Sequence, residues 1–137
     1  MKTIENLSHK SISDKDNLAI IELVREGVLY SSFEKIYRQL PFTLEQWARF
    51  LDTTVRTLQR WKRVNALFSV SYAEKVIEIY QLYKFGEEVF GTDGFNKWLN
   101  SDIAALEDKK PISFLNNTYG IQLIRSRLGR IQHGILA

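Results

Sequence analysis

The chain has 137 residues with no cysteine and only two histidines, which excludes a disulfide framework and a thiolate metal site, and no zinc-ligand spacing occurs around His9 or His133. Hydrophobic residues make up 45% of the chain and its net charge is +3 at pH 7, so we expect a packed core and a surface that permits a nucleic-acid partner without requiring one. No apolar run is long enough to span a membrane and no signal-peptide core stands at the N-terminus, so the expected location is the cytoplasm.

Residues 1–15 are polar and lack a clear period, and we expect them to be loose. A helix is then predicted over Asn17–Glu26, with Asp14 or Asp16 as its cap and Gly27 as its stop. The residues expected to face inward from this helix are Leu18, Ile21 and either Leu23 or Val24.

A second helix is predicted from Ser31 to about Gln39. Ser31 and Glu34 form a capping-box pattern at its start, and Pro41 ends it because the residue before a proline disfavours the helical conformation. The apolar positions of this helix are Phe33, Ile36, Tyr37 and Leu40.

The stretch Thr43–Arg63, with the sequence TLEQWARFLDTTVRTLQRWKR, predicts two short helices joined by a tight turn. Thr43 and Gln46 form a capping-box pattern, and Asp52 stands where the turn needs a left-handed backbone, which aspartate tolerates better than most residues. The small Ala48 precedes the turn where two crossing helices leave no room for a large side chain. The apolar face of the first helix is Leu44, Trp47, Ala48 and Leu51. Together these features predict a helix-turn-helix.

The second helix of this pair, capped by Thr54, has one apolar and one basic face. Val55, Leu58 and Trp61 are expected to be buried, with Trp61 in the core. Residues 53–63 contain four basic residues and no acid. Such a face is either a solvated helix side or, as we favour, the part of a helix-turn-helix that enters a DNA major groove. The candidate DNA-binding residues are Thr54, Arg56, Thr57, Gln59, Arg60, Lys62 and Arg63.

The second half of the chain predicts further helices. Ser71 is the expected cap of a long helix that Gly91 ends, and Asn117 or Thr118 caps the last helix. Pro111 opens a short helical turn between them. The predicted helices are Tyr72 to about Phe90, Gly94–Asn100, and a final helix to about His133 that turns Ile121, Ile124, Leu128 and Ile131 inward.

Only residues 68–72 alternate with a period of two, and that run is too brief to count as a sheet. The predicted fold class is therefore all-α, with an N-terminal helix-turn-helix bundle over residues 1–66 and a small helical domain over residues 67–137. Residues 71–110 hold eight acids and five bases, so the second domain is not expected to bind DNA. Trp98 is expected to lie in a core rather than in a ligand site.

Several short motifs of the second half occur in order: Phe90-Gly91, Trp98-Leu99, Leu106, Pro111, Leu115, Gly120, Leu128, Ile131 and Gly134. In the first half, residues 56–60 read RTLQR. The ordered set resembles the toxin-binding domain of the Xre/MbcA/ParS antitoxins, and RTLQR resembles a helix start in the helix-turn-helix domain that precedes it in that family. The resemblance covers residues 43–137. The sequence departs from the family's pattern at Gly86 and Phe95, where an alanine is usual, and at Glu107-Asp108, where Gly-Gly is preferred.

The resemblance implies the antitoxin of a type II toxin–antitoxin pair. Such a protein binds and neutralises a RES-domain toxin, an enzyme that consumes NAD, and represses its own operon by binding double-stranded operator DNA. We expect a homodimer or a toxin–antitoxin hetero-oligomer without a membrane, metal or cofactor, and no enzyme activity. The last helix is expected to turn Arg125, Arg127 and Arg130 outward. The candidate toxin-binding residues are Arg127, Arg130, Gly134, Ile135, Leu136 and Ala137.

Three other interpretations remain open. The chain is a stand-alone helix-turn-helix regulator if its second half only dimerises and no toxin partner exists. It is an interaction module if the helix-turn-helix no longer binds DNA. An enzyme is the most distant alternative, because no base or nucleophile accompanies the arginines of the last helix. In the plainest interpretation of the apolar tail, residues 135–137 are simply frayed.

Overall fold

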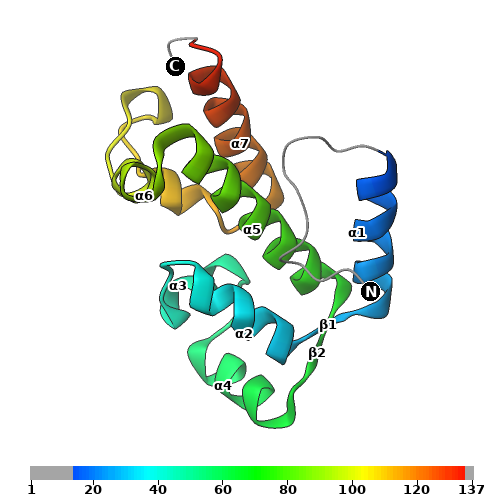
Figure 1. The fold of residues 1–137 in the computed structure, drawn as a ribbon. Coiled ribbons are helices and arrows are strands. Elements are labelled where there is room, and N and C mark those ends of the chain that lie inside the picture. The colour runs from blue at the N-terminus through cyan, green and yellow to red at the C-terminus, as the bar shows by residue number, and fades with distance from the viewer. Residues whose placement is uncertain (1–13, 135–137) are drawn as a thin grey trace. The chain divides into compact units, whose positions relative to one another are not determined.

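The structure of the chain is a computed structural model that describes residues 14–134 (Figure 1). These residues pack as two compact units, which divide between Gln81 and Leu82. The division falls inside one long helix, α5 (Val70–Phe90). The predicted boundary between the two functional domains, after residue 66, stays a prediction. The first turns of α5 belong to the first unit, because Tyr72 packs against an aromatic ring of the helix-turn-helix.

The first unit is helical apart from a small two-stranded sheet. Its elements are α1 (Asp14–Glu26), β1 (Val28–Leu29), α2 (Tyr30–Gln39), α3 (Leu44–Phe50), α4 (Val55–Val64), β2 (Leu67–Phe68) and the start of α5. The predicted all-α class is confirmed, but the prediction that no sheet forms is wrong. β1 and β2 pair in antiparallel register, Val28 with Phe68 and Leu29 with Leu67. Strands of two residues are too short to leave an alternating pattern in the sequence.

Gly27 permits this strand pairing. It ends α1 as predicted, with a left-handed φ of +93°. A Cβ at this position would lie 2.5 Å from Cδ1 of Leu67. Any other residue would therefore strain the backbone and displace the exposed Leu67 side chain.

The face that α1 turns inward differs from the predicted one. α1 begins at Asp14, earlier than expected, and residues 1–13 of the segment predicted to be loose lie outside the described residues. Leu18 and Ile21 were predicted to face inward, yet they are 63% and 44% exposed. Val24 is half-buried, as is its neighbour Leu23. The contact between α1 and the rest of the unit is narrower than the apolar stripe of the helix, so two large hydrophobic residues stay at the surface.

The N-terminus of α2 is capped by a side chain from the C-terminal end of α4. α2 begins at Tyr30, and the backbone N–H of Ser31 donates to Oδ1 of Asn65 over 2.9 Å. Asn65 reaches this position from a left-handed φ of +46° directly after α4. The predicted capping box of Ser31 and Glu34 is wrong, because a tertiary contact supplies the acceptor and the Glu34 carboxylate is engaged with Lys62 instead.

The helix-turn-helix forms as predicted. The hydroxyl of Thr43 accepts from the N–H of Gln46, whose side chain accepts from the N–H of Thr43 in return. Asp52 lies in the turn at a φ of +54°, and the N–H of Thr53 donates to the carbonyl of the buried Ala48 over 2.8 Å. These contacts fix the angle at which α3 and α4 meet.

An aromatic cluster forms the core beneath α4. Phe33 packs edge-on against Trp47 at 5.1 Å between ring centroids. Trp61 of α4 lies 5.3 Å from Phe68 and 5.1 Å from Tyr72. Trp61 is half-buried rather than enclosed, so it closes the edge of the cluster. The buried aromatic residues described in this unit are Tyr30, Phe33, Phe42, Trp47, Phe50, Phe68 and Tyr80.

The second unit is built from short helices around α7. Its elements are the last turns of α5, α6 (Thr92–Leu99), the 3-10 helices η2 (Ala104–Leu106) and η3 (Pro111–Phe114), and α7 (Thr118–Gln132). Pro111 opens η3 and Asn117 caps α7 by accepting from the N–H of Gly120 over 2.8 Å, both as predicted. Gly91 ends α5 at a φ of +75°. Within residues 14–134 no helix has the length and apolar character to cross a membrane.

Two helices of the second half begin two residues before their predicted starts. α5 begins at Val70 because the hydroxyl of Ser69, rather than that of Ser71, accepts from the N–H of Tyr72 over 3.5 Å. α6 begins at Thr92, directly after Gly91. In both cases the sequence offers several residues that can start a helix, and packing selects the earlier one.

Candidate functional site

α4 presents a basic face from a firmly anchored helix. Leu58 is fully buried, and Val55 and Trp61 are half-buried on the same side. The opposite side carries the exposed Arg56, Arg60 and Arg63, flanked by the exposed Gln59 and the half-buried Thr57. Lys62 is exposed too, but it stands four residues after Leu58, at the edge that faces α2. No acid lies on α4 itself, which suits contact with a phosphate backbone. The structure thus gathers these six predicted residues on one helix.

Thr54, the remaining predicted residue of this set, caps α4. Its hydroxyl accepts from the N–H of Thr57 over 3.1 Å and donates to the Thr57 hydroxyl oxygen over 3.0 Å. The two threonines therefore hold each other at the N-terminal end of the helix, the end that a helix-turn-helix directs at base edges.

An acid on α2 borders the basic face. The Nζ of Lys62 lies 3.1 Å from Oε1 of Glu34, and the guanidinium of Arg38 lies 3.6 Å from the same oxygen. Sequence reasoning missed this pair because Glu34 was assigned to a capping box. One carboxylate thus neutralises part of the charge at the C-terminal end of α4, whereas Arg56 and Arg60 lie nearer its N-terminal end.

The predicted toxin-binding residues of α7 lie apart from its buried side. Ile121, Ile124 and Leu128 are buried as predicted. Arg127 is half-buried and Arg130 is exposed. Gly134 follows α7, exposed and at a left-handed φ of +75°. The other three predicted residues, Ile135, Leu136 and Ala137, lie outside the described residues.

Arg125 does not face outward as predicted. It is half-buried, and its Cζ lies 5.8 Å from the centre of the Phe85 ring. Burial lowers the pKa of this guanidinium. Arg125 follows the buried Ile124, and the Phe85 ring of α5 offers it an aromatic face that attracts a cation.

Two exposed apolar residues on α7 were missed. Tyr119 is 85% exposed and Leu123 is 42% exposed, and they are the only large hydrophobic residues of residues 82–134 that are exposed. They stand four residues apart, so they share one side of α7, and Arg127 continues that side one turn later. We call Tyr119, Leu123, Arg127 and Arg130 the α7 stripe. The sequence signal for the α7 stripe was the four-residue spacing of Tyr119, Leu123 and Arg127, on the side of the helix away from the buried Ile121 and Ile124.

No group of histidine and carboxylate residues with the geometry of a metal site occurs within residues 14–134. The described surface carries a basic face on α4 and a mixed apolar and basic stripe on α7.

Comparisons with known proteins assign both halves of the chain. Residues 19–79 match the antitoxin Xre-like helix-turn-helix domain, and residues 85–134 match the antitoxin Xre/MbcA/ParS C-terminal toxin-binding domain. The fold is similar to that of a chain in the crystal structure of the M. tuberculosis MbcT–MbcA toxin–antitoxin complex, with a TM-score of 0.60 and 20% sequence identity over 79% of this chain and 96% of that chain. No curated protein matches the chain by sequence.

Proposed function

The chain belongs to the Xre/MbcA/ParS family of antitoxins, and on that premise we propose that it neutralises a RES-domain toxin in the cytoplasm and represses its own operon by binding DNA. The observation that carries the proposal is the order of its two modules. A helix-turn-helix with an exposed basic face precedes a domain of the toxin-binding type.

The DNA half of the proposal rests on α4. Arg56, Gln59 and Arg60 are exposed on the outer side of this helix, and these side chains suit hydrogen bonding to base edges. Lys62 and Arg63 follow on the last turn and are assigned to phosphates. The hydroxyl of Thr54 is engaged with Thr57. Thr54 would therefore support DNA binding indirectly, by holding the N-terminal end of α4 in place.

A single reading helix contacts few base pairs, so we propose that two copies bind a pseudo-palindromic operator. The half-sites would be about 34 Å apart, or a multiple of that distance, because each α4 must meet the same face of the duplex. Each copy brings the four cations Arg56, Arg60, Lys62 and Arg63, so binding would weaken steeply with salt as counterions are released.

The toxin half of the proposal rests on the second unit. It is supported by the match of residues 85–134 to the family's toxin-binding domain. The large apolar groups exposed on this part of the chain are Tyr119 and Leu123 of the α7 stripe. An aromatic and an aliphatic anchor beside arginines have the composition of an interface centre. Arg127 and Arg130 would steer the chain towards acidic toxin surface.

The tail beyond Gly134 is the second part of the proposed toxin contact. Residues 135–137 would enter the toxin's cleft, and together with the arginines of α7 they would help to exclude an anionic dinucleotide such as NAD. Removal of residues 135–137 would then weaken neutralisation and leave DNA binding unchanged.

Co-expression tests the whole proposal. The chain is produced together with a RES-domain toxin encoded beside it, and growth, cellular NAD and co-purification are measured. We expect restored growth, preserved NAD and a stable complex. A chain that neither co-purifies with the toxin nor preserves NAD would overturn the toxin half. An unchanged operator affinity and salt dependence of the Arg56→Ala/Arg60→Ala variant, compared with a Lys97→Ala control in the second unit, would overturn the DNA half.

A further inference from the structure

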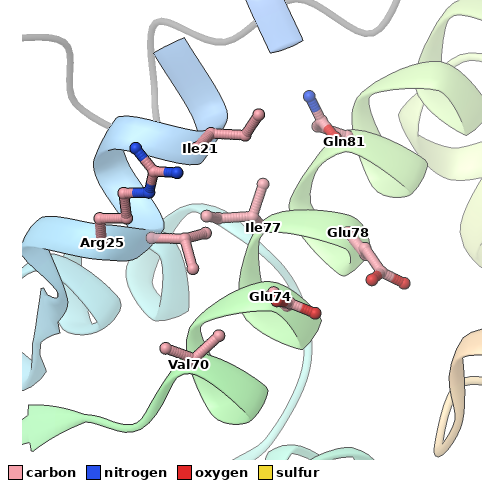
Figure 2. A pocket seen from close by; sticks show the side chains of 8 residues that line it. Ile21, Arg25, Val70, Glu74, Ile77, Glu78 and Gln81 are labelled. Atoms are coloured by element: carbon pink, nitrogen blue, oxygen red, sulfur yellow. The ribbon is translucent and has the colours of Figure 1, made fainter. Parts of the chain in front are cut away.

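A groove lies between α1 and α5 within the first unit (Figure 2). It has a volume of about 390 Å³, and its walls are mainly apolar. Figure 2 shows Ile21 on the α1 wall of the groove and Ile77 on the α5 wall. We call it the α1/α5 groove; its lining residues are Ile21, Val24 and Arg25 of α1 and Val70, Glu74, Ile77, Glu78 and Gln81 of α5.

Two of the groove's apolar lining residues, Ile21 and Val70, are exposed. The exposed large hydrophobic residues described in the first unit are Leu18, Ile21, Leu29, Val64, Leu67 and Val70. They come from α1, from the paired strands and from the helix ends next to those strands. Grouped exposed apolar surface of this kind marks a contact with another macromolecule.

The charges of the groove are divided between its walls. Arg25 stands on α1, whereas Glu74 and Glu78 stand one turn apart on α5. Among the side chains that the structure describes, none forms an ion pair with these three. Burial raises the pKa of Glu78, and so does the neighbouring Glu74 carboxylate, while Lys75 lowers it. A cation brought to this edge from outside would relieve the repulsion between the two carboxylates.

The exposed side of α1 is complementary to that edge. Leu18, Ile21 and Arg25 are spaced three and four residues apart, so they form one side of the helix. That side combines apolar groups with a cation, and the α5 wall combines apolar groups with two anions. The same surface therefore carries both halves of a contact, which is the property that a two-fold interface needs.

We propose that two copies of this chain meet at the α1/α5 groove, with α1 of each copy against α5 of the other. Arg25 of one copy then faces Glu74 and Glu78 of the other, and the same contact occurs twice. Ile21 lies at the centre of the apolar part. α4 contributes no residue to the groove, so its basic face stays available in such a dimer. The proposal stands whether or not the toxin partner is correctly identified.

A charge-exchange experiment on the full chain tests this interface. The variants are Arg25→Glu and Glu74→Arg/Glu78→Arg, with Lys97→Glu as a matched charge reversal on α6, outside the groove. Sedimentation of each protein alone gives its dimer dissociation constant, and circular dichroism checks its helix content. We expect a wild-type dimer, an unchanged Lys97→Glu dimer, and dissociation constants raised roughly tenfold or more for both groove variants, since like charges then face each other.

Mixing the two groove variants gives the decisive result. In a mixed dimer, the α1 that carries Arg25→Glu faces the α5 that carries Glu74→Arg/Glu78→Arg, so opposite charges meet again. The other side of the same dimer restores the natural contact. Affinity capture of one tagged variant should therefore retain the other, although each alone is mainly monomeric. A wild-type chain that stays monomeric at all concentrations, groove variants that dimerise like the wild type, or a mixture that forms no mixed dimer would each overturn the proposal.

Discussion

Phe95 of α6 occupies the space that a Cβ on Gly86 of α5 would fill. Phe95 is 1% exposed, and it is held in place by stacking against Phe90 and Trp98 at 6.4 and 6.1 Å between ring centroids. These are the two positions where the family's pattern usually has alanine. The large residue on one helix and the missing side chain on the other therefore form a matched pair.

This relationship predicts that the effect of Gly86→Ala changes sign with residue 95. Alanine in a helix interior is favoured over glycine by about 1 kcal/mol, but the clash with the packed Phe95 ring costs about 1–3 kcal/mol. Gly86→Ala should thus destabilise the wild type and stabilise the Phe95→Ala variant by about 1 kcal/mol. Urea unfolding of the four proteins measures both values, and a stabilising Gly86→Ala in both backgrounds would show that the ring is free to move aside.

The pair of Lys62 and Glu34 predicts that the natural chain binds DNA less tightly than it can. Glu34→Gln removes the carboxylate that holds Lys62 and Arg38. Because both ion pairs are partly exposed, the free energy of unfolding should change by less than about 0.5 kcal/mol. Operator affinity should rise, and the slope of its salt dependence should steepen by about one contact. Fluorescence anisotropy at several salt concentrations measures this, with Glu87→Gln in the second unit as the unaffected control; equal slopes for both variants would contradict the assignment of Lys62 to phosphate.

Trp61 is expected to act in folding rather than in base stacking. It closes the aromatic cluster against Phe68 and Tyr72, so Trp61→Ala should cost about 3 kcal/mol, while Trp61→Phe should cost less than about 1.5 kcal/mol. Chemical unfolding gives both values. A Trp61→Ala protein with wild-type stability and lost DNA binding would instead assign the indole ring to a direct contact.

The turn at Glu107 and Asp108 carries local strain. Both residues have a left-handed φ, +58° and +59°, at the place where the family prefers Gly-Gly. Left-handed backbone costs an ordinary residue about 1–2 kcal/mol, and glycine loses about 0.5–1 kcal/mol of chain entropy in exchange. Glu107→Gly should thus stabilise the chain by about 0.5–1 kcal/mol, whereas the control Ala105→Gly in η2 should destabilise it. A lower melting temperature for Glu107→Gly would contradict this account.

The local signals in the sequence predicted most of the helix-turn-helix, because they act within a few residues. The capping pair Thr43 and Gln46, the turn residue Asp52 and the cap Thr54 all hold in the structure. The cap of α2 was predicted wrongly because the N–H of Ser31 donates to Asn65, which is 34 residues away in the chain.

Exposure was harder to predict than helix formation. The sequence shows that α1 and α7 have apolar sides, but not how wide their contacts are. Leu18 therefore appeared to be a core residue, and Tyr119 and Leu123 were not recognised as surface. Arg125 was misplaced for the same reason, since its partner Phe85 comes from another helix.

Calorimetric titration of a purified RES-domain toxin into this chain measures whether the second unit carries the toxin contact. We expect tight binding by the wild-type chain and by the Arg56→Ala/Arg60→Ala variant, whose changes lie on α4. We expect binding weakened roughly a hundredfold or more by Tyr119→Ala/Leu123→Ala, because two interface anchors of about 2 kcal/mol each would be lost. No heat of binding with the wild-type chain, or binding abolished by the α4 changes and untouched by those on α7, would contradict a toxin contact through the second unit.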